Sequence, residues 1–166
     1  MTHSEGIVHP GAGPRHLDFH PNGRYIYVIN ELDTTMSVFS WDSDLGEMTE
    51  IQSISTLPDG VNGPKSCADV HIHPNGKFVY GSNRGHDSIV IYAVDESTGK
   101  LSLIGHESTH GKTPRNFTID PTTQYMLVAN QDTGNIVTFR IDPQSGKLAY
   151  IATTLPPTPV CLKFLA

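Results

Sequence analysis

The sequence predicts an all-β protein, a β-propeller built from four-stranded antiparallel blades. Three observations support this prediction. A fourteen-residue segment occurs three times, the prolines of its copies lie 53 and 47 residues apart, and helical periodicity is absent. A period near 50 residues with several short strands in each unit is typical of a propeller blade. The three copies are residues 17–30, 70–83 and 117–130.

Each copy is expected to form the first two strands of a blade. Apolar residues alternate along the first strand, and the second strand is rich in β-branched and aromatic residues, which suit a sheet. In the first two copies a Pro-Asn-Gly turn joins the strands. Asn and Gly tolerate the positive φ of hairpin turns, so these segments predict two hairpins.

Two further strands are expected to complete each blade. An apolar run follows each copy, at residues 37–41, 89–94 and 136–141. An acidic residue and a turn come next, and then a last apolar run. The three turns contain Gly46, Gly99 and Gly146, and the last runs begin at Met48, Leu101 and Leu148.

The whole chain, residues 1–166, is predicted to be one partial propeller. Complete blades are expected at residues 14–58, 67–110 and 114–157. Residues 159–166 match the first strand of a further blade, and residues 6–9 match the end of a preceding one. Propellers close with about 4–8 blades, so three blades form an incomplete ring. We therefore expect either that copies associate or that the chain is the C-terminal portion of a longer protein.

Composition and charge exclude several classes of protein. Charged residues make up 17% of the chain, and 15 Gly and 12 Pro indicate frequent turns. The net charge of −6 and the lack of a Lys/Arg run argue against nucleic-acid binding. No apolar stretch predicts a membrane span, and no signal-peptide pattern opens the chain, so a cytoplasmic location is predicted. Cys67 and Cys161 lack the spacing of a zinc ribbon.

The first strand of a blade begins, and its second strand ends, at one edge of the sheet, which we call the mouth. Residues at the mouth differ between blades although the surrounding frame repeats, which favours a functional role. Arginines there suit a carboxylate or phosphate ligand, and Glu31 or a histidine could move a proton. The mouth positions, blade by blade, are Arg15, His16 and Glu31, then Ala68, Asp69 and Arg84, then Arg115, Asn116 and Gln131.

These residues carry a resemblance to a known family. Gly-Pro-Arg-His-Leu-Asp-Phe-His-Pro at residues 13–21 and Asn-Glu-Leu-Asp at residues 30–33 resemble the lactonase family of seven-bladed β-propellers. That family includes bacterial-type 6-phosphogluconolactonases and the fungal carboxymuconate-lactonizing enzyme. The resemblance implies a hydrolase acting on a small anionic sugar-acid lactone, such as 6-phosphogluconolactone. Further matching segments follow in order at residues 68–74, 82–88, 111–117 and 160–164.

The resemblance also implies the residues of the site. The family's proposed catalytic set is a His, two Arg and a Glu at the mouth, with no metal and no cofactor. Arg15 and Glu31 match the first Arg and the Glu, and Arg84 matches the second Arg, with Arg115 as the alternative. The His belongs to a blade upstream of this sequence. Substrate-binding roles are expected for His16, His71, His86, Arg115, Asn116 and Gln131.

Other interpretations remain open at this point. We interpret His73, like His20, as a partner of a turn backbone rather than as a metal ligand paired with His71. Asp18, Asp69 and Asp87 are expected to accept hydrogen bonds from loop amides rather than to take part in catalysis. Instead of an enzyme, the chain could be a non-catalytic scaffold whose mouth binds an anionic small molecule or a protein partner. It could also be an inactive fragment without its N-terminal blades, prone to self-association.

Overall fold

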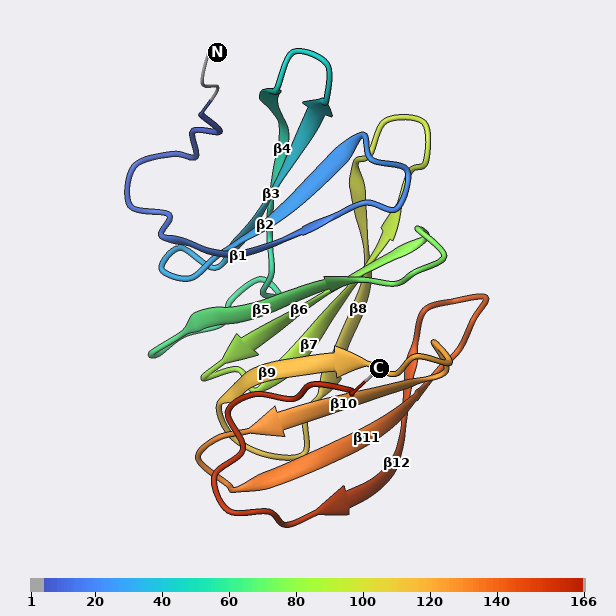
Figure 1. Ribbon diagram of the computed structural model, residues 1–166. Coiled ribbons are helices and arrows are strands. Elements are labelled where there is room, and N and C mark those ends of the chain that lie inside the picture. Colours follow the sequence, from blue (N-terminus) through green and yellow to red (C-terminus); the bar gives the residue numbers. More distant parts are fainter. Residues whose placement is uncertain (1–4, 166) are drawn as a thin grey trace.

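The computed structural model describes residues 5–165, which form twelve strands in three four-stranded antiparallel sheets (Figure 1). The sheets are stacked in chain order, and the first strands of neighbouring sheets contact each other. Residues 5–165 contain no helix, and hence none long and apolar enough to cross a membrane. The arrangement confirms the predicted fold class, because about three propeller blades are present and they do not close into a ring.

Within each sheet the strands pair in chain order, so each blade is an antiparallel meander. The first sheet contains β1 (Pro14–Phe19), β2 (Tyr25–Asn30), β3 (Thr35–Asp42) and β4 (Glu47–Ser55). The second sheet contains β5 (Ser66–Ile72), β6 (Phe78–Arg84), β7 (Ser88–Val94) and β8 (Leu101–Ser108). The third sheet contains β9 (Pro114–Ile119), β10 (Tyr125–Asn130), β11 (Asn135–Ile141) and β12 (Leu148–Thr154).

The second strand of a blade lies between two packed faces. Every residue of β2 is buried, and its side chains alternate between the two sides. Tyr27 packs into the core between the first and second sheets, together with Val70 of β5. Ile26 and Val28 form a smaller cluster with Phe39 on the other face of the sheet. Burial on both faces explains why the sequence of this strand is apolar without interruption.

A second core fills the space between the second and third sheets. Tyr80 of β6 and Ile91 of β7 pack there against Phe117 of β9 and Phe139 of β11, and all four are buried. Four aromatic rings, including that of Phe78, pack in this core with aliphatic residues, and each ring contributes a large buried apolar area. The two cores attach the three blades to one another, which fixes where the ends of their strands lie.

The two ends of the chain depart from the prediction. Residues 159–165, expected to start a further blade, form no strand, and Ala166 lies outside the described residues. The segment runs instead along β9, where the Leu162 amide donates to Asn116 Oδ1 (Figure 1). The first strand of every sheet pairs with the second strand of the same sheet, and the described residues contain no such strand after this segment. Residues 6–9 also form no strand, and Gly6 lies against Phe39 and Met48 of the first sheet.

Candidate functional site

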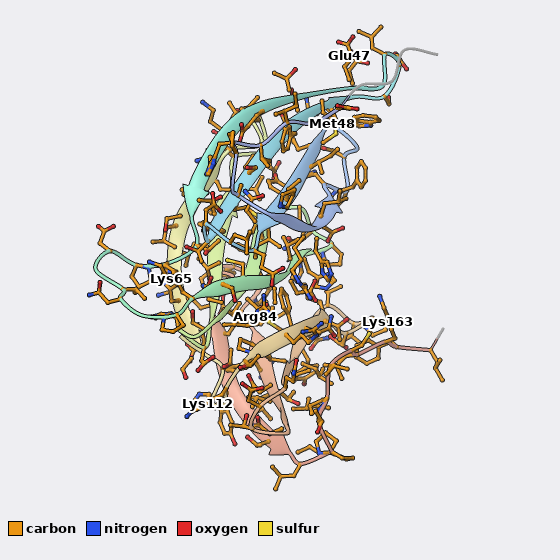
Figure 2. All side chains as sticks on the ribbon, turned by 90° about the vertical axis from the view of Figure 1, so that its left-hand side faces the viewer. Glu47, Met48, Lys65, Arg84, Lys112 and Lys163 are labelled. Atoms are coloured by element: carbon orange, nitrogen blue, oxygen red, sulfur yellow. The ribbon has the colours of Figure 1, made fainter. Side chains whose placement is uncertain are left out.

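The mouth predicted from the sequence is present at one end of the three sheets. Pro14 pairs with Asn30 where β1 begins and β2 ends, and Ser66 pairs with Arg84 at the same place in the second sheet. Figure 2 views the molecule from this side and shows Arg84 near the middle of the face. Chain topology therefore brings together residues that lie 53 positions apart in the sequence.

An ion-paired cluster of three residues occupies the mouth at the junction of the first and second sheets. Arg84 donates through one terminal nitrogen to Glu31 Oε1, and Arg15 Nε lies 3.5 Å from Glu31 Oε2. Both arginines are also held by carbonyl groups: Arg15 donates to the Ala68 oxygen at 2.6 Å and Arg84 to the Cys67 oxygen at 2.7 Å. The structure thus brings together Arg15, Glu31 and Arg84, the three residues assigned catalytic roles by the resemblance.

Electrostatics keep this cluster ionised and cationic. The hydrogen bond from Arg84 is the largest influence and lowers the pKa of Glu31. Burial opposes it, and the charges of Arg84, Arg15 and Arg115 lower the pKa further. Burial and the nearby charge of Arg84 lower the pKa of Arg15. Two guanidinium groups therefore contact one carboxylate and a third acts on it through its charge, and the excess positive charge suits an anionic ligand.

The two candidates for the second arginine differ in their contacts. Arg84 bonds directly to Glu31, whereas Arg115 directs one terminal nitrogen to Gln131 Oε1 at 3.4 Å and acts on Glu31 through its charge. Of the two, the geometry gives Arg84 the place beside the carboxylate. Arg115 and Gln131 lie at the corresponding place on the third blade, at the edge of the cluster.

A buried carboxylate, Asp69, forms the centre of a second cluster beside the first. Its Oδ1 lies 2.7 Å from His16 Nδ1, and its Oδ2 accepts a hydrogen bond from Asn116 Nδ2 at 2.5 Å. His71 Nε2 lies 3.4 Å from Oδ2, and Asp69 is only 3% exposed. Burial alone would raise the pKa of Asp69, but the hydrogen bonds and charge of His71, with the bonds from His16 and the Phe117 amide, lower it to about 2.

The role of Asp69 was only partly expected. It accepts hydrogen bonds from backbone amides, but these are the strand amides of Val70 and Phe117 and not loop amides, and it also binds side chains from both neighbouring blades. A signal for this was present, because His16, Asp69 and Asn116 occupy the same slot in successive blades. Residues with complementary hydrogen-bonding groups in one slot of adjacent repeats are expected to meet.

A cavity of about 450 Å³ lies beside Arg15 of the first cluster and is lined by His16, Asp69, His71 and Asn116 of the second, whereas Glu31 and Arg84 are not among its lining residues. Lys163 and Leu162 from the C-terminal segment close one of its sides. A larger hollow of about 830 Å³ lies at the opposite end of the first sheet, around Phe19 and Trp41, away from the charged clusters. The smaller cavity is therefore the better candidate for a ligand. Its polar lining includes Arg15, His16, Asp18, Asp69, His71, Asn116 and Lys163.

The remaining histidines separate into different roles. His86 Nδ1 lies 2.7 Å from Ser88 Oγ and its ring contacts His106. Like Glu31 and Arg84, it is not among the residues that line the cavity. His73 Nε2 lies 3.0 Å from the Thr123 carbonyl oxygen, and His20 contacts the Gly76 oxygen in the same way. These contacts fit the interpretation of both residues as partners of turns. No group of three or more His, Cys, Asp or Glu residues in the described part of the chain is arranged to hold a metal.

Known proteins are similar to this chain in sequence and in fold. The family model described as "Lactonase, 7-bladed beta-propeller" matches residues 2–164. A 6-phosphogluconolactonase of Bacillus subtilis is 41% identical over 157 residues, which is 94% of this chain and 45% of the relative. A 6-phosphogluconolactonase of Formosa agariphila is 49% identical over 123 residues, covering 72% of this chain and 34% of the relative.

A solved structure of a gluconolactonase is also similar to this chain. The periplasmic gluconolactonase of Pseudomonas aeruginosa superposes with a TM-score of 0.90 at 34% identity, covering 96% of this chain and 44% of that protein. The chain thus spans less than half the length of each of these relatives. The match to the family model over nearly all residues shows that the chain belongs to the family of seven-bladed β-propeller lactonases.

Proposed function

We propose that the chain provides the arginine–glutamate part of a lactonase site that hydrolyses a sugar-acid lactone such as 6-phosphogluconolactone without a metal. The observation that carries the proposal is the cluster of Arg15, Glu31 and Arg84 beside the 450 Å³ cavity. The relatives named as 6-phosphogluconolactonases support the choice of substrate.

The arginines account for binding and for charge stabilisation. A guanidinium forms paired hydrogen bonds with a phosphate or carboxylate, which would hold the anionic substrate in the cavity. When water adds to the lactone carbonyl carbon, the carbonyl oxygen becomes an oxyanion. A positive charge already fixed beside that oxygen stabilises the transition state more than the ground state.

Glu31 is suited to orient the attacking water by accepting a hydrogen bond from it, rather than to act as a proton donor. The arginines that lower its pKa keep it ionised near neutral pH, and an ionised carboxylate only accepts hydrogen bonds. It would align the attacking water while the ring carbon–oxygen bond breaks. The proton lost by the water ends on the departing ring oxygen, and the product is the open hydroxy acid.

The test is acid release from 6-phosphogluconolactone by this chain, measured above the spontaneous rate. We expect Arg15→Ala and Glu31→Gln to lower kcat/KM by about 100-fold each, the scale of loss for an oxyanion-stabilising group. Arg24→Ala is the matched control, because Arg24 is an exposed arginine beside the larger hollow at the other end of the first sheet. Equal rates for wild type and Arg15→Ala would refute the site assignment.

The same variants separate an enzyme from a scaffold. A scaffold would bind 6-phosphogluconate saturably, with weaker binding in Arg15→Ala, yet would not accelerate lactone hydrolysis. We further propose a cytoplasmic location, which cell fractionation would test; the Pseudomonas relative is described as periplasmic.

A further inference from the structure

Arg15 is held on two sides by neighbours that accept hydrogen bonds. One terminal nitrogen of Arg15 donates to the Ala68 carbonyl oxygen at 2.6 Å and lies 3.2 Å from His16 Nε2. A guanidinium has only donors, so this contact requires His16 Nε2 to be an unprotonated acceptor. The direction of Arg15 therefore depends on which nitrogen of His16 carries the proton.

Asp69 determines which nitrogen of His16 carries the proton. Its Oδ1 lies 2.7 Å from His16 Nδ1, and an ionised carboxylate only accepts hydrogen bonds, so the proton sits on Nδ1. Nε2 is then left as the acceptor that Arg15 needs. The hydrogen-bond directions along Asp69, His16 and Arg15 are consistent with one another.

Asp69 is itself held rigidly. The amides of Val70 and Phe117 and the side chain of Asn116 donate to its two oxygens, and His71 lies against Oδ2. These donors come from the second and third sheets, whereas His16 and Arg15 come from the first. Contacts within the second and third sheets thus fix Asp69, and Asp69 in turn fixes His16 and Arg15 on the first sheet.

We propose that Asp69 and His16 are positioning residues that hold Arg15 in the orientation in which its Nε faces Glu31. The proposal rests on the proposed function, because Arg15 is the residue through which the pair would act on a substrate. Replacing the carboxylate by an amide lets this residue donate to His16 Nδ1, which places the proton on Nε2, facing a guanidinium that only donates. A carboxylate-to-amide change that yields the wrong tautomer is a known way to impair a histidine in a serine protease.

The first experiment reads the tautomer directly and does not depend on catalysis. In ¹⁵N-labelled protein at pH 8, two-bond proton–nitrogen correlations of the His16 ring are expected to show the Nδ1–H form. Asp69→Asn is expected to change this to the Nε2–H form and to move the Arg15 Nε–H signal. Asp18→Asn is the matched control, because Asp18 faces His71 and the Ile72 amide. An Nε2–H tautomer in wild type overturns the proposal even if Asp69→Asn fails to fold.

The second experiment distinguishes positioning from proton transfer. The Gln side chain can place an oxygen near the former Nε2 and accept from Arg15, whereas Asn can reach only toward Asp69. We expect His16→Gln to keep kcat/KM within about 3-fold of wild type and His16→Asn to lose about 100-fold, the cost of a misplaced catalytic group. Equal, large losses in both variants would mean that the His16 ring itself acts on the substrate, as a general base or as a binding group, and would overturn the proposal, as would two unchanged variants.

Failure of the proposed function leaves this test intact. If the wild type does not hydrolyse 6-phosphogluconolactone, the same two variants are compared by calorimetric binding of 6-phosphogluconate. Retained affinity in His16→Gln and about 10-fold weaker binding in His16→Asn support the positioning role. Equal affinities in both variants refute it.

Discussion

The junction between the first and second sheets and the junction between the second and third share one set of contacts. Tyr27 donates through its hydroxyl to the Gly99 carbonyl oxygen at 3.1 Å, and Tyr80 donates to the Gly146 oxygen at 2.9 Å. His20 and His73 likewise reach the neighbouring blade by contacts of 3.0 Å each. The repeat in the sequence is thus a repeat of the interactions that join one blade to the next.

The two junctions differ at the mouth. The first junction carries Arg15, Glu31 and Arg84, whereas Ala68 and Gln131 stand in the matching slots of the second junction and form no ion pair there. Contacts that recur therefore assemble the blades, and residues that occur at a single junction are available for a ligand.

Gly99 provides the strongest test of the repeated contacts. It has φ of +73° and lies over the Tyr25 ring, where an added Cβ would come within 2.4 Å of Tyr25 Cδ1. Gly46 has φ of +68° in the same turn of the first blade, but a Cβ there would meet nothing within 4 Å. We expect Gly99→Ala to lower the free energy of unfolding by about 3 kcal/mol and Gly46→Ala by about 1 kcal/mol. Urea unfolding measures both.

Gly146→Ala sharpens this comparison. Its added Cβ would lie 2.5 Å from Phe78 Cδ1, so its cost should match that of Gly99→Ala. A Gly46→Ala variant as unstable as the other two would show that backbone strain, and not the packing of blade on blade, makes glycine necessary in these turns.

The next largest effect on stability is expected from protonation of Asp69 at low pH. Its pKa is lowered from 3.8 to about 2 in the folded protein, so folding is favoured by its ionised form. This contribution, roughly 2 kcal/mol, is fully present above about pH 4 and is lost as the pH falls toward 2. Urea unfolding between pH 5 and pH 2 should show a steeper loss for wild type than for Asp69→Asn, and parallel curves would contradict the prediction.

The sequence predicts features that local residue patterns determine better than features that depend on contacts between blades. The blades follow from local signals, such as the turns after His20 and His73, and were predicted correctly. The network around Asp69 was predicted only in part, because the repeat shows that His16, Asp69 and Asn116 share a slot but does not show which of their atoms pair across the blades. The substrate-binding role expected for His86 stays a prediction, since a loop residue takes its direction from tertiary contacts, here with Ser88 and His106.

The tyrosine hydroxyls test whether the two junctions are equivalent. Tyr27→Phe and Tyr80→Phe each remove one buried hydrogen bond and leave a carbonyl oxygen without it. We expect each change to cost about 1 kcal/mol in thermal or urea unfolding. Unequal costs beyond about 0.5 kcal/mol would mean that one junction carries more of the stability than the other.

The smallest stability effect is expected where the effect on a ligand is largest. Glu31 is about one-third exposed, with 35% of its side-chain surface accessible, and pairs of this kind contribute little. Glu31→Gln should therefore change the free energy of unfolding by about 0.5 kcal/mol or less in urea unfolding at pH 7. The lowered pKa of Glu31 sets the sign: its contribution is present above the unfolded pKa and disappears as the pH falls. A loss of several kcal/mol would mean that the ion pairs at the mouth join the blades as the tyrosines do, and that the distinction between recurring and single contacts does not separate structure from function.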